Sequence, residues 1–165
     1  MKIGIISDTH DNIPLIKKAV DIFNKENVEL VLHAGDIISP FIAPKCFKDL
    51  KCKLKLVYGN NDGEKLFLKK KFEEIGAEIA GEYLEFTINN KKIYVTHAIS
   101  NSVVEALAKS GDYDIIVYGH THEKVVKKVN NTLIVNPGEC CGYLTDESTI
   151  AVIDLDKLEA ELIKL

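Results

Sequence analysis

Short apolar runs rich in β-branched residues alternate with segments of helical spacing through the first two thirds of the chain, and this alternation limits the fold most strongly. The predicted elements in this part are strands at 2–7, 29–33 and 53–58 and helices at 12–27, 40–50 and 64–75. Strands that are joined by helices are typical of βαβ units. The sequence therefore predicts a largely parallel sheet here.

Strand pairs with short turns dominate the rest of the chain, where two Asn-Asn turns at 89–90 and 130–131 each separate two strand-like runs. The predicted elements are strands at 82–88, 92–96, 115–118, 124–129, 132–135, 149–155 and 158–165 and a helix at 103–109. Hairpins combined with βαβ units favour an α/β fold of two mixed sheets packed face to face, with helices outside. The length of 165 residues predicts a single domain, 1–165.

The charge of the chain argues against strong binding to nucleic acid. The net charge is −4, and all 21 basic residues are lysine, because arginine is absent. The lysine runs at 69–71, 91–92 and 127–128 are predicted to be solvated surface. Without a bidentate guanidinium group, an anionic substrate must be held in another way.

The N-terminus and the cysteines indicate a cytoplasmic protein. The first residues, MKIGIISDTH, read as a strand without a cleavage site, and no apolar run is as long as a membrane span. Cys46, Cys52, Cys140 and Cys141 form no C-x-x-C pair, so reduced thiols are predicted. No membrane partner is expected, and assembly into a homo-oligomer stays open.

Five apolar strands are each followed by side chains that can bind a metal ion. These strands and their ends read IGIISDTH, LVLHAGD, KLVYGNND, KIYVTH and IIVYGHTH. Because ligands bind at the carboxyl ends of strands in α/β sheets, we expect these side chains to lie close together. They are Asp8, His10, Asp36, Asn60, His97, His120 and His122.

The spacing within these motifs favours convergence of the side chains. Asp8 and His10 lie two residues apart, as do His120 and His122, and in an extended chain such residues point to the same side. In three motifs (GD, GN and GH) a glycine directly precedes the ligand and permits a sharp turn and a close backbone approach.

The alternative is that these residues are unrelated, since Asp and Asn are common in turns after strands. Four of the five histidines, together with several Asp and Asn residues at strand ends, favour a shared metal site instead. His33 is the exception, because it lies inside a predicted strand. We expect it to be buried or to support the site without binding the metal.

The ligand types limit the metal. Imidazole, carboxylate and amide oxygen without thiolate exclude a structural zinc site of the cysteine type and suit manganese, iron, nickel, cobalt or zinc. Seven ligands are too many for one ion with an open position. They suit two ions that share a bridging carboxylate, an arrangement used for phosphoryl chemistry. Two divalent transition-metal ions, with manganese as the first choice, are the expected cofactors.

The ordered motifs SDTH, GD, GNND, THA and GHTH resemble those of the calcineurin-like metallophosphoesterases, which have the form D-x-H, G-D, G-N-[HD], H and G-H-x-H. The short chain is similar to the small archaeal and bacterial phosphodiesterases of that family. The resemblance runs from Asp8 to His122 and implies a four-layer αββα sandwich with a binuclear metal site.

The resemblance also implies a ligand set for each ion. The first ion is held by Asp8, His10, Asp36 and His122, and the second by Asp36, Asn60, His97 and His120. Asp36 bridges the two ions, and a hydroxide between them attacks phosphorus. The implied activity is that of a metal-dependent phosphodiesterase acting on a small phosphodiester substrate.

Asn61 departs from the family pattern, in which a histidine often follows the metal-binding asparagine and assists the leaving group. Asn61 can donate a hydrogen bond but cannot act as a general acid at neutral pH. Asp62 keeps its place and is expected to position a water or a neighbouring group. Asn61 and Asp62 are the predicted catalytic residues, and we expect dependence on good leaving groups. The segment NPGE at 136–139 is predicted to be a structural turn.

Two other functions stay open. A phosphomonoesterase or nucleotide hydrolase can have the same fold, and so can a non-catalytic scaffold, because a retromer subunit with this fold mainly binds proteins. A scaffold has no need of a complete ligand set. Here all seven ligands are present, which favours the enzyme.

Overall fold

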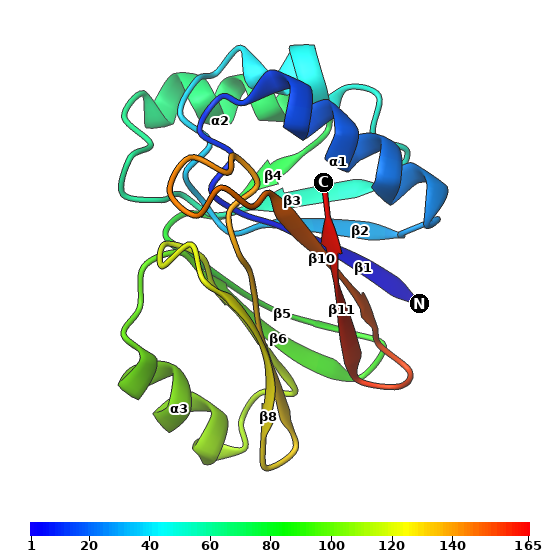
Figure 1. The fold of residues 1–165 in the computed structure, drawn as a ribbon, viewed down its shortest axis with the longest axis vertical. Coiled ribbons are helices and arrows are strands. Elements are labelled where there is room, and N and C mark those ends of the chain that lie inside the picture. Colours follow the sequence, from blue (N-terminus) through cyan, green and yellow to red (C-terminus); the bar gives the residue numbers. More distant parts are fainter.

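The computed structural model describes residues 1–165 as two β-sheets that pack face to face, with helices on both outer sides (Figure 1). The first sheet has the strand order β11-β10-β1-β2-β3-β4, and the second has the order β5-β6-β7-β9-β8. In Figure 1, α1 and α2 cover the first sheet at the top, and α3 lies at the bottom beside the second sheet. The predicted α/β four-layer αββα sandwich is confirmed.

The first half of the chain forms the parallel part of the first sheet and its helices. The elements are β1 (Lys2–Ile6), α1 (Ile13–Lys25), β2 (Leu30–His33), β3 (Lys53–Leu56), α2 (Lys65–Glu73) and β4 (Glu78–Ile79). Neighbouring strands from β1 to β4 pair in parallel. Helix α1 buries Ile16, Ala19, Val20 and Phe23, which share one face at helical spacing.

Two details differ from the prediction for this half. The helix predicted at 40–50 is reduced to one π-helical segment, η1 (Ala43–Phe47). Pro44 lies at its first turn and lacks an N–H, which weakens continuous α-helical hydrogen bonding. Strand β4 was not predicted, because two residues are too few to show an alternating pattern.

The second half forms the second sheet and then returns to the first. The elements are β5 (Tyr83–Ile88), β6 (Lys91–Thr96), α3 (Asn101–Ser110), β7 (Ile115–Val117), β8 (Lys124–Val129), β9 (Thr132–Pro137), β10 (Thr149–Asp154) and β11 (Glu159–Lys164). Both Asn-Asn hairpins are confirmed by the antiparallel pairing of β5 with β6 and of β8 with β9. Asn89 and Asn90 have φ of 48° and 58°, as in a two-residue hairpin turn, whereas at the second turn Asn130 has φ of 53°.

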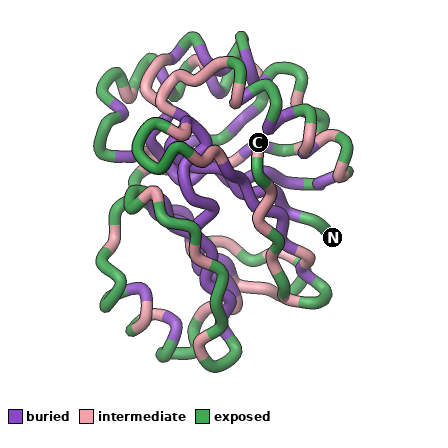
Figure 2. Tube along the Cα trace, in the orientation of Figure 1, coloured by how far each residue is buried: buried purple, intermediate pink, exposed green.

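The core is divided by the two sheets into three apolar layers. A central cluster between the sheets joins residues such as Ile3, Ile5 and Leu32 of the first sheet to Ile93 and Ile115 of the second. Separate clusters lie beneath α1 and α2 and beneath α3. Figure 2 shows the buried chain concentrated in the strands, with exposed loops around them. Because both sheets build the central cluster, we propose that residues 1–165 are one domain.

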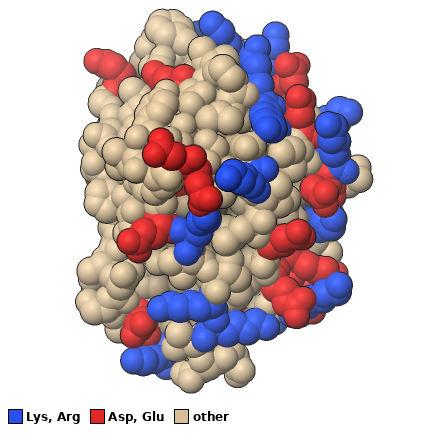
Figure 3. All heavy atoms as spheres, in the orientation of Figure 1, with Lys and Arg blue, Asp and Glu red and all other residues tan.

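The surface carries charges of both signs. Each of the three lysine runs contributes an ion pair with a carboxylate, namely Lys71–Glu74, Lys92–Glu85 and Lys127–Glu105. On the face drawn in Figure 3, lysine and acidic side chains are interspersed. No helix is both long and apolar enough to cross a membrane.

Candidate metal centre

The loops that follow β1, β2, β3, β6 and β7 carry the predicted ligands, so that both sheets contribute to one site. Asp8, His10 and His122 form one group whose ligand atoms lie within 4.8 Å of one another. Asp8, Asp36 and His97 form a second group under the same limit. The carboxyl ends of the strands therefore bring together residues that are more than 100 positions apart in the sequence.

Asn60 and His120 complete the cluster on the side of His97. The side-chain oxygen of Asn60 lies 3.0 Å from Nε2 of His97. The ring of His120 lies with its centroid 5.2 Å from that of His97, in an edge-on arrangement. The ring centroids of His10 and His122 lie 5.7 Å apart, with the two ring planes tilted by 36°. The structure thus brings all seven predicted side chains to one place.

Asp36 lies between the two groups of histidines. Its Oδ2 atom is 3.4 Å from Nε2 of His10 and 3.3 Å from Nε2 of His97. Its side chain is 1% exposed, so the carboxylate is shielded from solvent. A carboxylate in this position is placed to contact two ions at once.

The backbone at the ligands is left-handed, not extended. The residues with positive φ include Asp8 (51°), His10 (37°), Asp36 (58°), His120 (68°) and His122 (60°). The prediction that an extended chain aims each pair of ligands to one side is therefore wrong; tight bends aim them instead. Such conformations cost about 1–3 kcal/mol each and cluster at functional sites, where the surrounding contacts hold them.

Two glycines allow the ligand loops to approach one another. A Cβ atom on Gly59 would lie 2.1 Å from Oδ1 of Asp36, and one on Gly119 would lie 2.0 Å from Oγ of Ser7. Any side chain at either position would push a ligand loop away from the cluster. This agrees with the close backbone approach predicted from the sequence.

The charges of the cluster favour a bound cation. Burial acts to raise the pKa of Asp36, but hydrogen bonds from His97 and Asn61 outweigh it and hold this pKa well below its usual range. Contact with Asp8 raises the pKa of His122 to about 9, and Glu139 adds to this effect. The carboxylate of Asp36 thus stays ionised and attracts positive charge, which a proton on histidine or a metal ion can supply.

Two buried atoms in the cluster have no hydrogen-bond partner. They are Oδ1 of Asp8 and Nε2 of His10. Buried polar atoms are almost always paired, and leaving one unpaired costs free energy. Both atoms belong to the first group of ligands, and a metal ion would satisfy both. The nitrogen and oxygen donors also fit a divalent transition metal.

Second hydrogen bonds fix the ring orientation of two histidines. Nδ1 of His97 lies 2.7 Å from the carbonyl oxygen of Ala34, and Nδ1 of His122 lies 2.7 Å from Oε2 of Glu139. An Nδ1–H that donates to these acceptors leaves the Nε2 lone pair free on the side of the cluster. Metal-binding histidines usually have such partners.

Glu139 is the functional residue that the sequence did not reveal, because NPGE was interpreted only as a turn. The side chain is fully buried, and Oε1 accepts hydrogen bonds from the amides of Leu144 and Thr145. Burial acts to raise the pKa of Glu139, but hydrogen bonds from Cys141, Thr145 and His122 lower it to about 2. The only signal in the sequence was an acidic residue four positions after the end of the strand predicted at 132–135.

Asp62 is buried and accepts hydrogen bonds only from the backbone. Its Oδ1 accepts from the amides of Ile37 and Ile38, and its Oδ2 accepts from those of Asp36 and Gly59, at 2.7–3.1 Å. The carboxylate therefore ties the loop that carries Asp36 to the loop that carries the GNND motif. This geometry favours positioning of neighbouring groups, one of the two roles expected for Asp62.

Asn61 contacts Asp36 through both its backbone and its side chain. The backbone amide donates to Oδ1 at 2.8 Å, and the side-chain amide donates to Oδ2 at 2.6 Å. Asn61 is otherwise exposed. It therefore lies at the open side of the cluster.

His33 lies outside the ligand cluster. Its Nε2 pairs with the hydroxyl of Thr9, and its Nδ1 accepts from the amide of Gly35, both at 3.1 Å. Burial lowers the pKa of His33 to about 3, so the ring is neutral at ordinary pH. Because both ring nitrogens make hydrogen bonds to Thr9 and Gly35, His33 supports the loops that carry Asp8 and Asp36.

Two mixed sheets with histidine, aspartate and asparagine side chains gathered at the strand ends define a metallophosphoesterase. The calcineurin-like phosphoesterase superfamily domain matches residues 1–158, and the chain belongs to this family. The predicted class of enzyme, a hydrolase of phosphoester bonds, is confirmed at the level of the family.

Individual relatives extend this assignment. The chain is 49% identical over 160 residues to phosphodiesterase MJ0936 of Methanocaldococcus jannaschii, covering 96% of each chain. It is similar over 100% of both chains to a solved structure described as a novel archaeal phosphodiesterase, with a TM-score of 0.94 and 47% identity. The Vps29 protein of Entamoeba histolytica, solved with zinc, has a TM-score of 0.73 at 20% identity and 99% coverage of both chains. That last likeness shows the fold alone.

Proposed function

We propose that the protein is a metal-dependent phosphodiesterase with two divalent metal ions. Asp8, His10, Asp36 and His122 hold one ion, and Asp36, Asn60, His97 and His120 hold the other. When bound, the two ions supply a hydroxide nucleophile between them and neutralise the charge of the phosphate oxygens.

The observation that carries this proposal is the position of Asp36. Its Oδ2 atom lies at nearly equal distances from His10 and His97, which belong to different ligand groups. A cluster built for one ion has no need of a carboxylate between two sets of imidazoles. The unpaired atoms of Asp8 and His10 support the same interpretation.

The chain's own residues prepare the site before substrate arrives. Glu139 and the carbonyl group of Ala34 orient His122 and His97, and Asp62 holds two ligand loops together. These groups keep the ligands in place, so little reorganisation is needed during the reaction. The side-chain amide of Asn61 has two N–H donors, and only one of them is used on Asp36, so the second can donate a hydrogen bond to the substrate.

A diester is favoured over a monoester as the substrate. A monoester carries a second negative charge, and the chain has no arginine to clamp a dianion. The relative that is 49% identical is also named a phosphodiesterase. Phosphomonoesters and nucleotides are thus the weaker alternatives.

The nitrogen and oxygen donors of the proposed sites suit manganese first, with nickel, cobalt, iron or zinc as alternatives.

The cellular location that we propose is the cytoplasm, because all four cysteines are free and three of them are buried thiols. Burial raises the pKa of Cys141 to about 12, which keeps this thiol protonated beside Glu139.

The test is to remove metal with a chelator and add back single divalent metals. Hydrolysis of bis(p-nitrophenyl) phosphate and of p-nitrophenyl phosphate is then measured with each metal. We expect no activity in the stripped protein, recovery with a transition metal, and a higher kcat/KM for the diester. Full activity without metal, or a preference for the monoester, would contradict the proposal.

A further inference from the structure

A pocket of about 230 Å³ lies directly beside the ligand cluster. Two of the residues that line it, Asn60 and His97, belong to the proposed second metal site. The others are Tyr58, Gly59, Lys65, Glu82, Thr96 and Ala98. Pockets that hold whole drug-sized ligands usually measure about 300–1,000 Å³. This pocket is therefore sized for one part of a substrate whose phosphate lies at the cluster.

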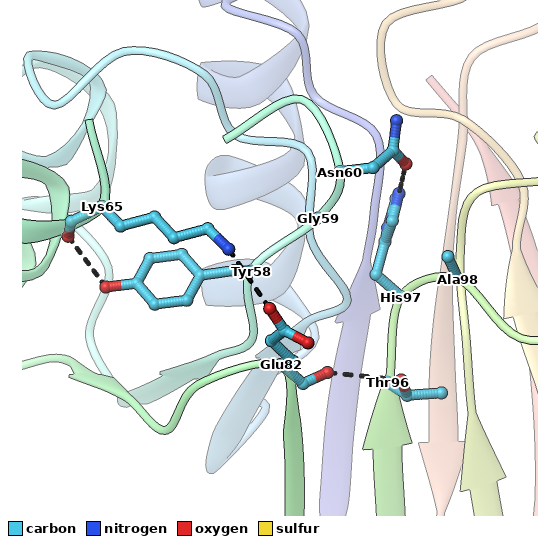
Figure 4. A pocket seen from close by; sticks show the side chains of 8 residues that line it. All are labelled: Tyr58, Gly59, Asn60, Lys65, Glu82, Thr96, His97 and Ala98. Carbon is cyan, nitrogen blue, oxygen red and sulfur yellow. Dashed lines mark hydrogen bonds and ion pairs between the residues drawn. The ribbon is translucent and has the colours of Figure 1, made fainter. Parts of the chain in front are cut away.

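The far wall of the pocket is formed by Tyr58 and Lys65. Figure 4 shows these two residues on one side and Asn60 and His97 on the other. The hydroxyl of Tyr58 donates to the carbonyl oxygen of Lys65 at 2.8 Å, which fixes the ring. The ammonium group of Lys65 lies 5.2 Å from the centre of that ring. The bond from Tyr58 to Lys65 thus joins the loop after β3 to the first residue of helix α2.

The polar groups of the pocket offer both a donor and an acceptor. Nζ of Lys65 lies 3.3 Å from Oε1 of Glu82, and their side chains are 43% and 82% exposed. An ion pair this long and this exposed is weak, so its partners can rearrange around a ligand at little cost. The hydroxyl of Thr96 makes one long hydrogen bond, 3.3 Å, to the carbonyl oxygen of Glu82.

This lining selects among three kinds of ester group. A plain alkyl group would cover Lys65, Glu82 and Thr96 without replacing the hydrogen bonds that they make to water. A second anion would gain Lys65 but would meet the carboxylate of Glu82 beside it. A neutral group with free hydroxyls can accept from Lys65 and donate to Glu82 at the same time. The pocket therefore matches a sugar or polyol.

The geometry of phosphoryl transfer indicates which of the two ester groups enters. The attacking and leaving oxygens lie roughly in line, so the ester group that stays on phosphorus points sideways from that axis. A pocket beside the ligands suits the sideways group. We propose that this pocket binds the retained alcohol of the diester and that Lys65 and Glu82 select alcohols with free hydroxyl groups, an inference that rests on the proposed function.

The test keeps the leaving group constant and varies the retained alcohol. The substrates are glyceryl p-nitrophenyl phosphate and methyl p-nitrophenyl phosphate, assayed with manganese-loaded protein. We expect a higher kcat/KM for the glyceryl diester, mainly through a lower KM. Lys65→Met and Glu82→Gln should each lower the ratio of the two kcat/KM values by about 3- to 10-fold, the loss expected for one hydrogen bond.

Matched controls separate this inference from the proposed function. Lys69→Met changes a lysine of the same helix that pairs with Glu73 outside the pocket, and it should leave the ratio unchanged. Calorimetric titration of the manganese-loaded protein with the products, glycerol phosphate and methyl phosphate, should show the same preference without turnover. Absence of hydrolysis of either diester would refute the proposed function. Hydrolysis of both with a ratio near one, or an equal loss for both substrates in Lys65→Met, would overturn the inference alone.

Discussion

The side-chain amide of Asn61 donates a 2.6 Å hydrogen bond to Oδ2 of Asp36, the oxygen that lies between His10 and His97. The residue next to the proposed metal-binding Asn60 is therefore held against the carboxylate that is proposed to bridge the two ions. An amide in this position can hold Asp36 with one N–H and donate the other to the substrate, but it cannot transfer a proton to a leaving oxygen.

The first prediction concerns the leaving group. Because Asn61 cannot protonate an alkoxide, aryl diesters should be hydrolysed far faster than alkyl diesters. Asn61→His should accelerate alkyl diesters more, by up to about 10²-fold, the lower end of general-acid catalysis. The measurement is the dependence of kcat on leaving-group pKa for both proteins. Equal slopes would mean that another group supplies the proton.

The second prediction concerns Glu139. Glu139→Ala removes the partner of Nδ1 of His122 and should weaken metal binding at that group about 10- to 100-fold. Calorimetric titration of stripped protein with manganese measures the affinity of each site. Glu123→Ala, which alters an exposed glutamate next to His122, is the control and should bind metal normally. Equal affinities in the two variants would show that Glu139 does not orient the ligand.

The third prediction concerns the pH dependence of stability in the metal-free protein. Burial holds the pKa of His33 at about 3, below its ordinary value of 6.5. Between these two pH values, His33 is protonated in the unfolded chain but neutral in the folded protein. Below about pH 6.5, wild type should therefore lose stability relative to His33→Gln, by up to about 1.4 kcal/mol per pH unit. Above that pH the difference should be constant. Urea unfolding of both proteins, at about five pH values from 4 to 8, measures this difference in the free energy of unfolding.

A difference that stays flat below pH 6.5 would show that His33 titrates normally in the folded protein. The metal content of His33→Gln serves as the control. Both ring nitrogens of His33 already have partners outside the cluster, so the variant should still bind two ions.

The fourth prediction concerns Asp62. Asp62 is 3% exposed, and its carboxylate accepts four backbone hydrogen bonds, three of them buried. Asp62→Ala therefore leaves these amide donors without their partner. We expect a loss of about 3 kcal/mol or more in the free energy of unfolding, together with weaker metal binding. Asp49→Ala, at an exposed aspartate, should change neither. If Asp62→Ala keeps stability and metal and loses only turnover, Asp62 acts on the substrate instead.

The sequence could predict which side chains gather at one place, because the candidate ligands follow apolar strands and strand ends show in local patterns. Each of five of them follows the end of a strand by one to four residues, namely Asp8, Asp36, Asn60, His97 and His120. The topology brings these side chains together, because β1, β2 and β3 are parallel, as are β6 and β7, and the carboxyl ends of these strands meet.

The supporting roles of Glu139 and Asp62 could not be predicted from the sequence, because they depend on contacts between residues that are distant in the chain. The bond from His122 to Glu139 spans 17 positions, and the bonds from Asp62 to the loop after β2 span 24 to 26. Such contacts leave no spacing pattern. The left-handed backbone at Asp8 and His122 is likewise set by the surrounding loops, because positive φ is uncommon for any residue other than glycine, even though Asp and His adopt it more often than most.

The most direct test of the two-metal account is a crystal structure of the manganese-loaded protein with anomalous diffraction data. We predict two anomalous peaks about 3.5–4 Å apart, as in other two-metal sites, with the carboxylate of Asp36 in contact with both. Asp8, His10 and His122 should surround one peak, and Asn60, His97 and His120 the other. A single peak, or two peaks of which only one contacts Asp36, would contradict the account.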